Sequence, residues 1–129
     1  DYHREHVEPA LDDRSVVYHG PVGGAERTKI QSSARALLHL INFDEPFGLS
    51  VVEALASGTP VIAANRGAMP ELIDHGVTGF LVNSVDEAVD AIGRIGEIDR
   101  AACRAVVSAR FTVDRMADRY LEVYRSLLG

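Results

Sequence analysis

The sequence is poor in the residues that would indicate disulfide, nucleic-acid or membrane chemistry. Cys103 is the only cysteine among 129 residues, so no disulfide can form within the chain. Lys29 is the only lysine and the formal net charge is −6, which argues against the basic surface of a nucleic-acid-binding protein. No apolar run approaches the roughly 18 residues of a membrane span, and no signal-peptide pattern is present. We therefore expect a cytoplasmic protein that binds no nucleic acid.

The composition is that of one folded domain. Hydrophobic residues make up 47% and charged residues 25% of the chain, as in ordinary globular proteins. A chain of this length buries about two thirds of its unfolded surface without disulfides or metals. The sequence opens on Asp1, inside a charged and helix-like segment, and we expect it to be a piece of a longer protein.

Short apolar runs alternate with helical patterns, which is typical of a Rossmann-like open parallel sheet flanked by helices. We predict strands over residues 15–20, 35–41 (buried), 59–65 and 78–83. Helices are predicted over residues 24–34, 48–58, 69–76, from 84 onward, 99–109 and 113–128. In such α/β proteins, ligands bind outside the carboxyl ends of the strands.

Two of the predicted helices carry long apolar stripes. The helix that begins at Ser84 has a capping box with Glu87, and its apolar positions are Val85, Ala88, Val89, Ile92 and Ile95. The last helix has two stripes, one of Met116, Tyr120, Val123 and Leu127, the other of Leu121, Tyr124 and Leu128. A helix with so broad an apolar surface usually packs on more than one partner.

The loop before the second predicted helix is the strongest candidate site. Pro46 biases Glu45 away from helical geometry, so Glu45 should lie outside a helix that begins near Gly48. The N–H groups of Phe47, Gly48 and Leu49 would then lack helical partners and attract an anion such as a phosphate. Neither a GxGxxG motif nor a P-loop lysine is present, so no ATP or NAD fingerprint applies.

Glu53 poses a question within this helix. Spacing places Leu49, Val52 and Ala56 on the face toward the sheet, with Glu53 on or beside that face. A buried carboxylate needs a polar partner. The residues alone leave two partners open: an arginine of this chain, or the ribose hydroxyls of a bound nucleotide.

A resemblance covers nearly the whole chain. The run EPFGLSVVEALASGTPVIAANRGAMPELIDHGVTGFLV, from Glu45 to Val82, closely resembles the donor-binding core of family 4 glycosyltransferases. VVYHGPV before it and RFTVDRMADRYLEVYRSLL after it are also similar to that family. The family's enzymes are retaining and have the GT-B fold of two Rossmann-like domains. The resemblance implies that residues 1–129 form a single partial nucleotide-sugar-binding domain, from the C-terminal half of such an enzyme.

The resemblance also implies roles for the candidate residues. Glu45 would be the catalytic-site acid that contacts the donor sugar, and Glu53 would bind the ribose. The amides of Phe47, Gly48 and Leu49 would bind the sugar and the diphosphate. The turn from Gly20 to Val22 would lie near the nucleobase, although a plain tight turn explains it equally well.

The same resemblance implies a substrate. The donor would be a UDP- or GDP-sugar, used without a cofactor or a bound metal, and the acceptor is unknown. His3 and His6 have no evident third ligand with which to hold a metal, and Cys103 is predicted to pack in the interior.

Two parts of the family's pattern are not found in this sequence. These are a strand whose arginine and lysine grip the diphosphate, and the N-terminal Rossmann-like domain. We therefore expect the isolated chain to be inactive. The last helix packs across the domains in the family, so here we expect exposed apolar surface and self-association. The alternative is a non-catalytic binding module on the same scaffold; a receiver-like fold would need an acidic cluster and a late lysine that are absent.

Overall fold

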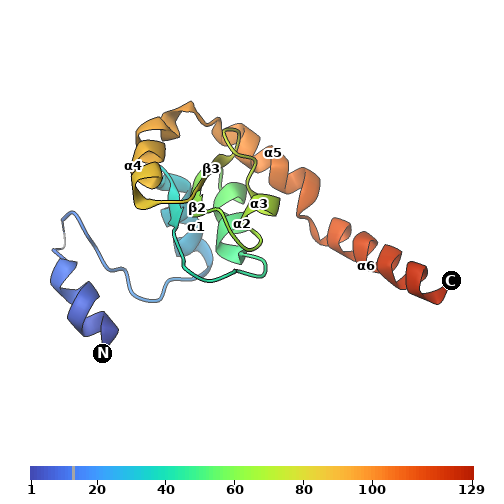
Figure 1. Ribbon diagram of the computed structural model, residues 1–129, viewed down its shortest axis with the longest axis horizontal. Coiled ribbons are helices and arrows are strands. Elements are labelled where there is room, and N and C mark those ends of the chain that lie inside the picture. The colour runs from blue at the N-terminus through green and yellow to red at the C-terminus, as the bar shows by residue number, and fades with distance from the viewer. Residues whose placement is uncertain (13) are drawn as a thin grey trace.

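A three-stranded parallel sheet forms the centre of the protein. The computed structural model describes residues 1–12 and 14–129 (Figure 1). The strands are β1 (Leu37–His39), β2 (Val61–Ala64) and β3 (Gly79–Val82), in the order β1-β2-β3. In this register Leu38 lies beside Ile62, and Ile62 lies beside Phe80. The prediction of an α/β fold on an open parallel sheet is confirmed.

The described residues form six α-helices, five of which are part of the body around the sheet. They are α1 (Gly24–Ser33), α2 (Leu49–Ala56), α3 (Met69–Leu72), α4 (Val85–Arg94), α5 (Arg100–Arg110) and α6 (Val113–Leu128). Single turns of other helix types span His3–Val7, Glu8–Ala10 and Ile95–Glu97. Figure 1 shows α4 on one side of the sheet and α2 with α5 on the other.

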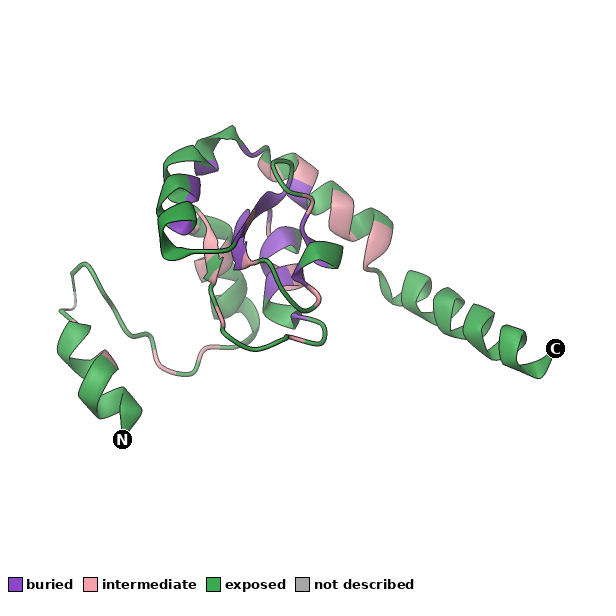
Figure 2. Ribbon diagram, viewed as in Figure 1, coloured by how far each residue is buried: buried purple, intermediate pink, exposed green. Residues whose placement is uncertain are grey.

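The core lies between these layers. Val61, Ile62 and Ala63 of β2 are fully buried, as expected for the central strand of a sheet that is covered on both faces (Figure 2). Phe80 from β3 and Leu55 from α2 pack into the same core. The carboxyl ends of all three strands are thereby held at one edge of a rigid layer.

Residues 15–20 do not form the predicted strand. Val16, Val17 and Tyr18 are exposed, in an arm that leads from the N-terminal turns to α1 (Figure 1). The Asp12 carboxylate accepts hydrogen bonds from the Ser15 hydroxyl and from the N–H groups of Ser15 and Val16, at 2.6 to 2.7 Å. The bond from Ser15 and those from the backbone hold the pKa of Asp12 well below its usual value. This turn bends the chain, and no strand among the described residues lies beside it.

The predicted strand over residues 35–41 is shorter than expected and is not fully buried. Leu38 on β1 is 51% exposed, because α4 packs on β2 and β3 and leaves this edge strand uncovered. The apolar stripe predicted on the helix that begins at Ser84 is also wrong in part. Ala88 and Ile95 are buried there, whereas Val85, Val89 and Ile92 are exposed.

The helix ends follow the predictions closely. The Ser84 hydroxyl accepts a hydrogen bond from the Glu87 N–H at 3.1 Å, and Glu87 in turn accepts one from the Asn83 N–H at 2.7 Å. Gly58 ends α2 in a left-handed conformation, with a φ of 75°. Helix α3 is shorter than predicted, since Ile73 is already extended.

Helix α5 is anchored by Arg100 to the C-terminal end of α1 and to the segment that follows α2. Its guanidinium donates to the carbonyl oxygens of Ala34 and Ser32, at 2.8 and 2.7 Å, and to the Thr59 hydroxyl at 3.0 Å. Cys103 on the same helix is buried, with its Sγ 3.6 Å from the Thr78 carbonyl oxygen, so its packing role is confirmed. Burial raises the pKa of this thiol.

Helix α6 extends away from the body of the protein (Figures 1 and 2). It buries none of its residues, and both predicted apolar stripes are exposed. The expectation of exposed apolar surface is therefore confirmed, while self-association stays a prediction. Within the part of the chain that the structure describes, no helix combines the length and apolar character needed to cross a membrane.

Candidate functional site

The loop between β1 and α2 is clamped by the loop that follows β2. The Ala68 N–H donates to the Glu45 carbonyl oxygen at 2.9 Å, and Arg66 Nε lies 3.0 Å from an oxygen of Asp44. Between them, Gly67 has a φ of 54°, and a Cβ at this position would lie 2.7 Å from the Glu45 nitrogen. The backbone of Glu45 is thus fixed by close packing against residues 66–68.

The next feature is the N-terminus of α2. Gly48 precedes the helix in a left-handed conformation, with a φ of 95°, which glycine adopts without strain. A Cβ on Gly48 would lie 2.8 Å from the Met69 side chain. Within the described residues, the N–H groups of Phe47, Gly48 and Leu49 donate to no protein acceptor. These three donors and the helix dipole together favour a bound anion.

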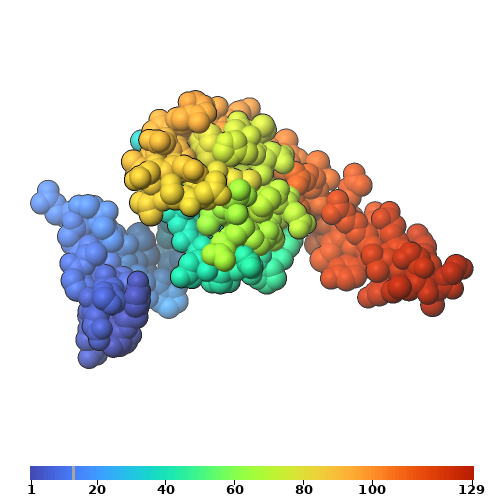
Figure 3. All heavy atoms as spheres, in the orientation of Figure 1, coloured from blue at the N-terminus to red at the C-terminus, as the bar shows by residue number. Residues whose placement is uncertain are grey.

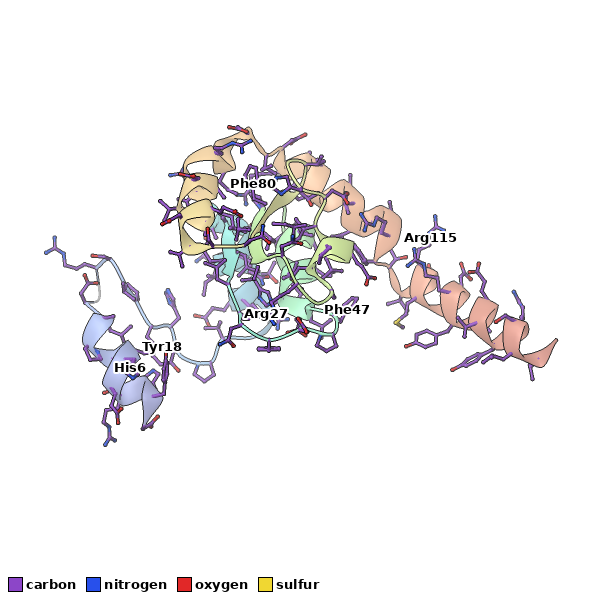
Figure 4. All side chains as sticks on the ribbon, in the orientation of Figure 1. His6, Tyr18, Arg27, Phe47, Phe80 and Arg115 are labelled. Atoms are coloured by element: carbon purple, nitrogen blue, oxygen red, sulfur yellow. The ribbon has the colours of Figure 1, made fainter. Side chains whose placement is uncertain are left out.

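These amides open onto a large groove. Its volume is about 1360 Å³, and Glu45 to Ser50 form one wall. The opposite wall comes from the end of α5 and from α6, including Phe111, Met116 and Tyr120. Figure 3 shows the body of the molecule and α6 meeting at an angle, and Figure 4 shows Phe47 on the side of the body that faces α6. Glu45 is half-buried in this wall, while Phe47 and Leu49 are exposed.

Glu53 has an arginine partner. Its Oε1 lies 2.8 Å from Nη2 of Arg27 on α1, and the Glu53 side chain is 34% exposed. Arg27 is seen close to α2 in Figure 4. The arginine partner, one of the two possibilities left open for Glu53, is therefore present in the structure. One oxygen of Glu53 engages Arg27, and the side chain remains accessible to a ligand.

The predicted inward face of α2 was wrong. The helix buries Val51, Ala54 and Leu55 against the sheet and α5, whereas Leu49 is 69% exposed. As a consequence Glu53 faces α1 and is absent from the wall of the groove that holds Glu45.

Gly20 and Val22 lie on the arm that leads into α1. Gly20 is left-handed, with a φ of 67° and open space around its Cβ position, as in a free turn. Among the described residues, no hydrogen bond or ion pair connects Gly20 or Val22 to the loop of Glu45, and neither lines the groove. The structure does not bring them to the other predicted residues, and their role near a nucleobase stays a prediction.

The two histidines near the N-terminus make local contacts. His3 Nδ1 lies 3.5 Å from a carboxylate oxygen of Glu8, and its ring is near Tyr18, while the His6 ring is near Tyr2. In the described residues, no three histidine, cysteine, aspartate or glutamate side chains gather as a metal ion would require.

The sequence interpretation missed the part played by the loop after β2. Arg66 and Gly67 are not among the predicted site residues, yet they hold Asp44 and Glu45 in place. The signal was their position directly after a buried strand, at the edge of the sheet where ligands bind.

Comparison with known proteins places this geometry in a family. The sequence model described as glycosyl transferases group 1 matches residues 1–97. A D-inositol 3-phosphate glycosyltransferase of Mycobacterium leprae is 39% identical over 105 residues, which cover 74% of this chain and 24% of that protein. An uncharacterized 41.2 kDa protein from the cps region of Klebsiella pneumoniae is 34% identical over 122 residues, covering 90% of this chain and 34% of that protein.

Solved structures agree with this result. The crystal structure of Anabaena HepE in complex with UDP has a TM-score of 0.67 and 29% identity, over 76% of this chain and 29% of that chain. The complex of HepE with UDP-glucose gives a TM-score of 0.68, over 80% of this chain and 30% of that one. The chain thus spans about a quarter to a third of the length of these relatives. It belongs to the group 1 family of glycosyltransferases.

Proposed function

We propose that this chain is the donor-binding part of a retaining glycosyltransferase, which moves a sugar from a UDP- or GDP-sugar to an acceptor. The observation that carries the proposal is the set of three unpaired amides at the N-terminus of α2, next to Glu45 and open to a groove. The likeness to HepE, which has been crystallised with UDP and with UDP-glucose, supports a nucleotide sugar as the ligand.

In this proposal the amides of Phe47, Gly48 and Leu49 bind the diphosphate and part of the sugar. Negative charge builds up on the diphosphate as the bond to the sugar breaks, and fixed N–H donors stabilise it without having to reorient. The clamp by residues 66–68 holds Glu45 so that its carboxylate can accept hydrogen bonds from the sugar hydroxyls. These residues do their work without a cofactor.

Glu53 binds the ribose in the same proposal. Arg27 engages Oε1 of Glu53, and the exposed part of the Glu53 side chain is available to the two ribose hydroxyls. Gly20 and Val22 would then contact the nucleobase.

The proposal assigns residues 1–129 to one partial domain of a larger cytoplasmic enzyme. An N-terminal Rossmann-like domain and an arginine–lysine pair would come from the rest of that enzyme, so the isolated chain should bind donor without transferring sugar. The alternative is a binding module that keeps the scaffold without catalysis. An assay of the full-length protein with UDP- and GDP-sugars separates the two. Only an enzyme releases UDP or GDP in an amount that matches the amount of acceptor glycosylated.

Substitution of Glu53 tests the ribose role. We expect Glu53→Gln to weaken the binding of UDP by about tenfold, the effect of losing charge-assisted hydrogen bonds. Arg27→Ala serves as the matched control because it breaks the same ion pair and leaves the carboxylate free to bind ribose. Isothermal titration with UDP and GDP measures both variants. If both bind like the unmodified chain, Glu53 serves only as the partner of Arg27 and the ribose role is wrong.

A further inference from the structure

Helix α3 supports the loop that carries the candidate donor site. Ala68, directly before α3, donates a hydrogen bond from its N–H to the Glu45 carbonyl oxygen, and the buried Met69 and Leu72 side chains lie against Gly48. A Cβ on Gly48 would be 2.8 Å from Met69 Cε and 3.3 Å from Leu72 Cδ1. A shift of α3 would therefore displace the backbone that presents the three unpaired amides.

Helix α3 is too short to keep this position by itself. It has 4 residues, and Pro70 in its first turn has no N–H to donate. A single helical turn closes too few hydrogen bonds to offset the entropy that is lost when it is ordered. The position of α3 must therefore come from its contacts with other elements.

The end of α5 lies beside α3 (Figure 1), and its last residue, Arg110, binds the C-terminal end of this short helix. Nη1 of Arg110 donates to both carboxylate oxygens of Asp74, at 2.9 and 3.1 Å, and Nη2 donates to the Glu71 carbonyl oxygen. Glu71 lies in the last turn of α3, where carbonyl groups lack helical partners. Hydrogen bonds from a guanidinium to a carboxylate are stronger than those between neutral groups. Arg110 and Asp74 thus form a clamp on α3.

Both halves of the clamp are themselves held in place. The Arg110 guanidinium lies over the ring of Phe111, 5.0 Å from its centroid, and Phe111 packs against the core. The Asp74 N–H donates to the hydroxyl of the buried Thr78 at 3.0 Å. The Asp74 carbonyl oxygen accepts hydrogen bonds from the N–H groups of Val77 and Thr78, each at 2.9 Å. The clamp therefore joins α3 to two fixed parts of the fold, the end of α5 and the turn before β3.

Arg110 also lines the groove, but its guanidinium is already engaged. Both terminal nitrogens donate to groups of the protein, and the Asp74 carboxylate compensates the positive charge of Arg110. A diphosphate would have to break this ion pair in order to bind Arg110 directly. The arrangement therefore favours an indirect role for Arg110, through α3.

We propose that Arg110 is a positioning residue of the donor site, which acts through α3 to fix the amides of residues 47–49 and the backbone of Glu45. This inference rests on the proposed function, because it explains how the amides named there are held. Donors that are fixed in advance stabilise charge on the diphosphate without having to reorient. Loss of the clamp should therefore weaken donor binding, although no residue that touches the donor is changed.

Variants of both partners of the clamp test the proposal. In the ¹⁵N-labelled chain, Arg110→Gln and Asp74→Asn should each shift the backbone N–H signals of residues 47–49 before any ligand is added. Each variant should weaken the binding of UDP-glucose by roughly tenfold, less than the hundredfold that a displacement of about 1 Å costs at a reacting group. The double variant should bind no more weakly than either single variant, because the two side chains act as one unit.

Arg94→Gln is the matched control. Arg94 on α4 pairs with Glu97 through two hydrogen bonds, at 3.1 and 2.9 Å, and its guanidinium lies over the ring of Phe80. Its surroundings thus resemble those of Arg110, but neither Arg94 nor Glu97 lines the groove. This variant should leave the N–H signals of residues 47–49 and the affinity for UDP-glucose unchanged. Urea unfolding of every variant separates a loss of stability from a loss of position.

The proposal is overturned if Arg110→Gln or Asp74→Asn stays folded and keeps its N–H signals or its affinity for UDP-glucose. Weaker binding in Arg110→Gln alone would show that Arg110 contacts the donor itself. If Arg110→Gln does not fold, Asp74→Asn decides by the same two measurements. An unmodified chain that does not bind UDP-glucose would contradict the donor site as a whole, whereas failure of the clamp alone leaves that binding intact.

Discussion

Replacing Gly79 by alanine should destabilise the fold severely. A Cβ at this position would lie 2.0 Å from the Val61 carbonyl oxygen and 2.9 Å from its nitrogen, so the clash is with the backbone of the neighbouring strand. Val61 is fully buried in the central strand and cannot move aside without disrupting the core. We expect a loss of more than about 4 kcal/mol in the free energy of unfolding, the range of the most damaging core substitutions.

Urea unfolding followed by far-ultraviolet circular dichroism measures this effect. Gly93→Ala is the matched control, since Gly93 lies inside α4 and its Cβ position is in open space. That variant should be more stable by about 0.5–1 kcal/mol, because alanine favours a helix over glycine. A Gly79→Ala chain that unfolds at the same urea concentration as the unmodified chain would show that the contact between β2 and β3 is wrong.

Gly67→Ala should leave the chain folded and disable the candidate donor site. Its Cβ would lie 2.7 and 2.8 Å from the Glu45 nitrogen and carbonyl oxygen, and the φ of 54° adds backbone strain. The exposed loop can give way where the core cannot, so Glu45 would shift away from the sugar. In the full-length protein we expect the rate of sugar transfer to fall by about a hundredfold, as for a displacement of about 1 Å at a reacting group.

Gly76→Ala separates this displacement from backbone strain alone. Gly76 is also left-handed, with a φ of 79°, but nothing lies near its Cβ position. The Gly76 variant should therefore lose some stability and keep its transfer rate. Equal losses of rate in both variants would show that Gly67 does not act by positioning Glu45.

The sequence was most informative where an element is buried on both sides. The apolar runs of β2 and β3 and the capping pair of Ser84 and Glu87 all appear as predicted. Parallel strands inside a sheet read as apolar runs because no face is exposed to water, and a helix cap depends only on neighbouring residues. These features are decided by local sequence and by burial.

The errors have a different physical origin. Val16 and Val17 have the composition of a strand, but a strand forms only beside a partner, and Asp12 turns the chain there. The inward face of α2 was mistaken because apolar residues occur on more than one side of the helix, and tertiary packing buries Val51, Ala54 and Leu55. Both outcomes depend on contacts that spacing along the chain does not encode.

The candidate site was predicted only in part. Glu45 and the amides of residues 47–49 share one wall of a groove, as their closeness in the sequence suggested. A second cavity, at the carboxyl ends of the strands, was missed because the asparagines that line it, Asn42, Asn65 and Asn83, are far apart in the sequence and meet only through the order of the strands. Such a site becomes visible once the sheet topology is known.

The central claim is that the amides at the N-terminus of α2 bind the diphosphate of a nucleotide sugar. Titration of the ¹⁵N-labelled chain with UDP-glucose tests it directly, through the backbone N–H resonances of Phe47, Gly48 and Leu49. Our account predicts that these three signals move downfield and saturate together, because each N–H gains an anionic acceptor. Saturable shifts confined to other residues, or no shifts at all, would contradict it.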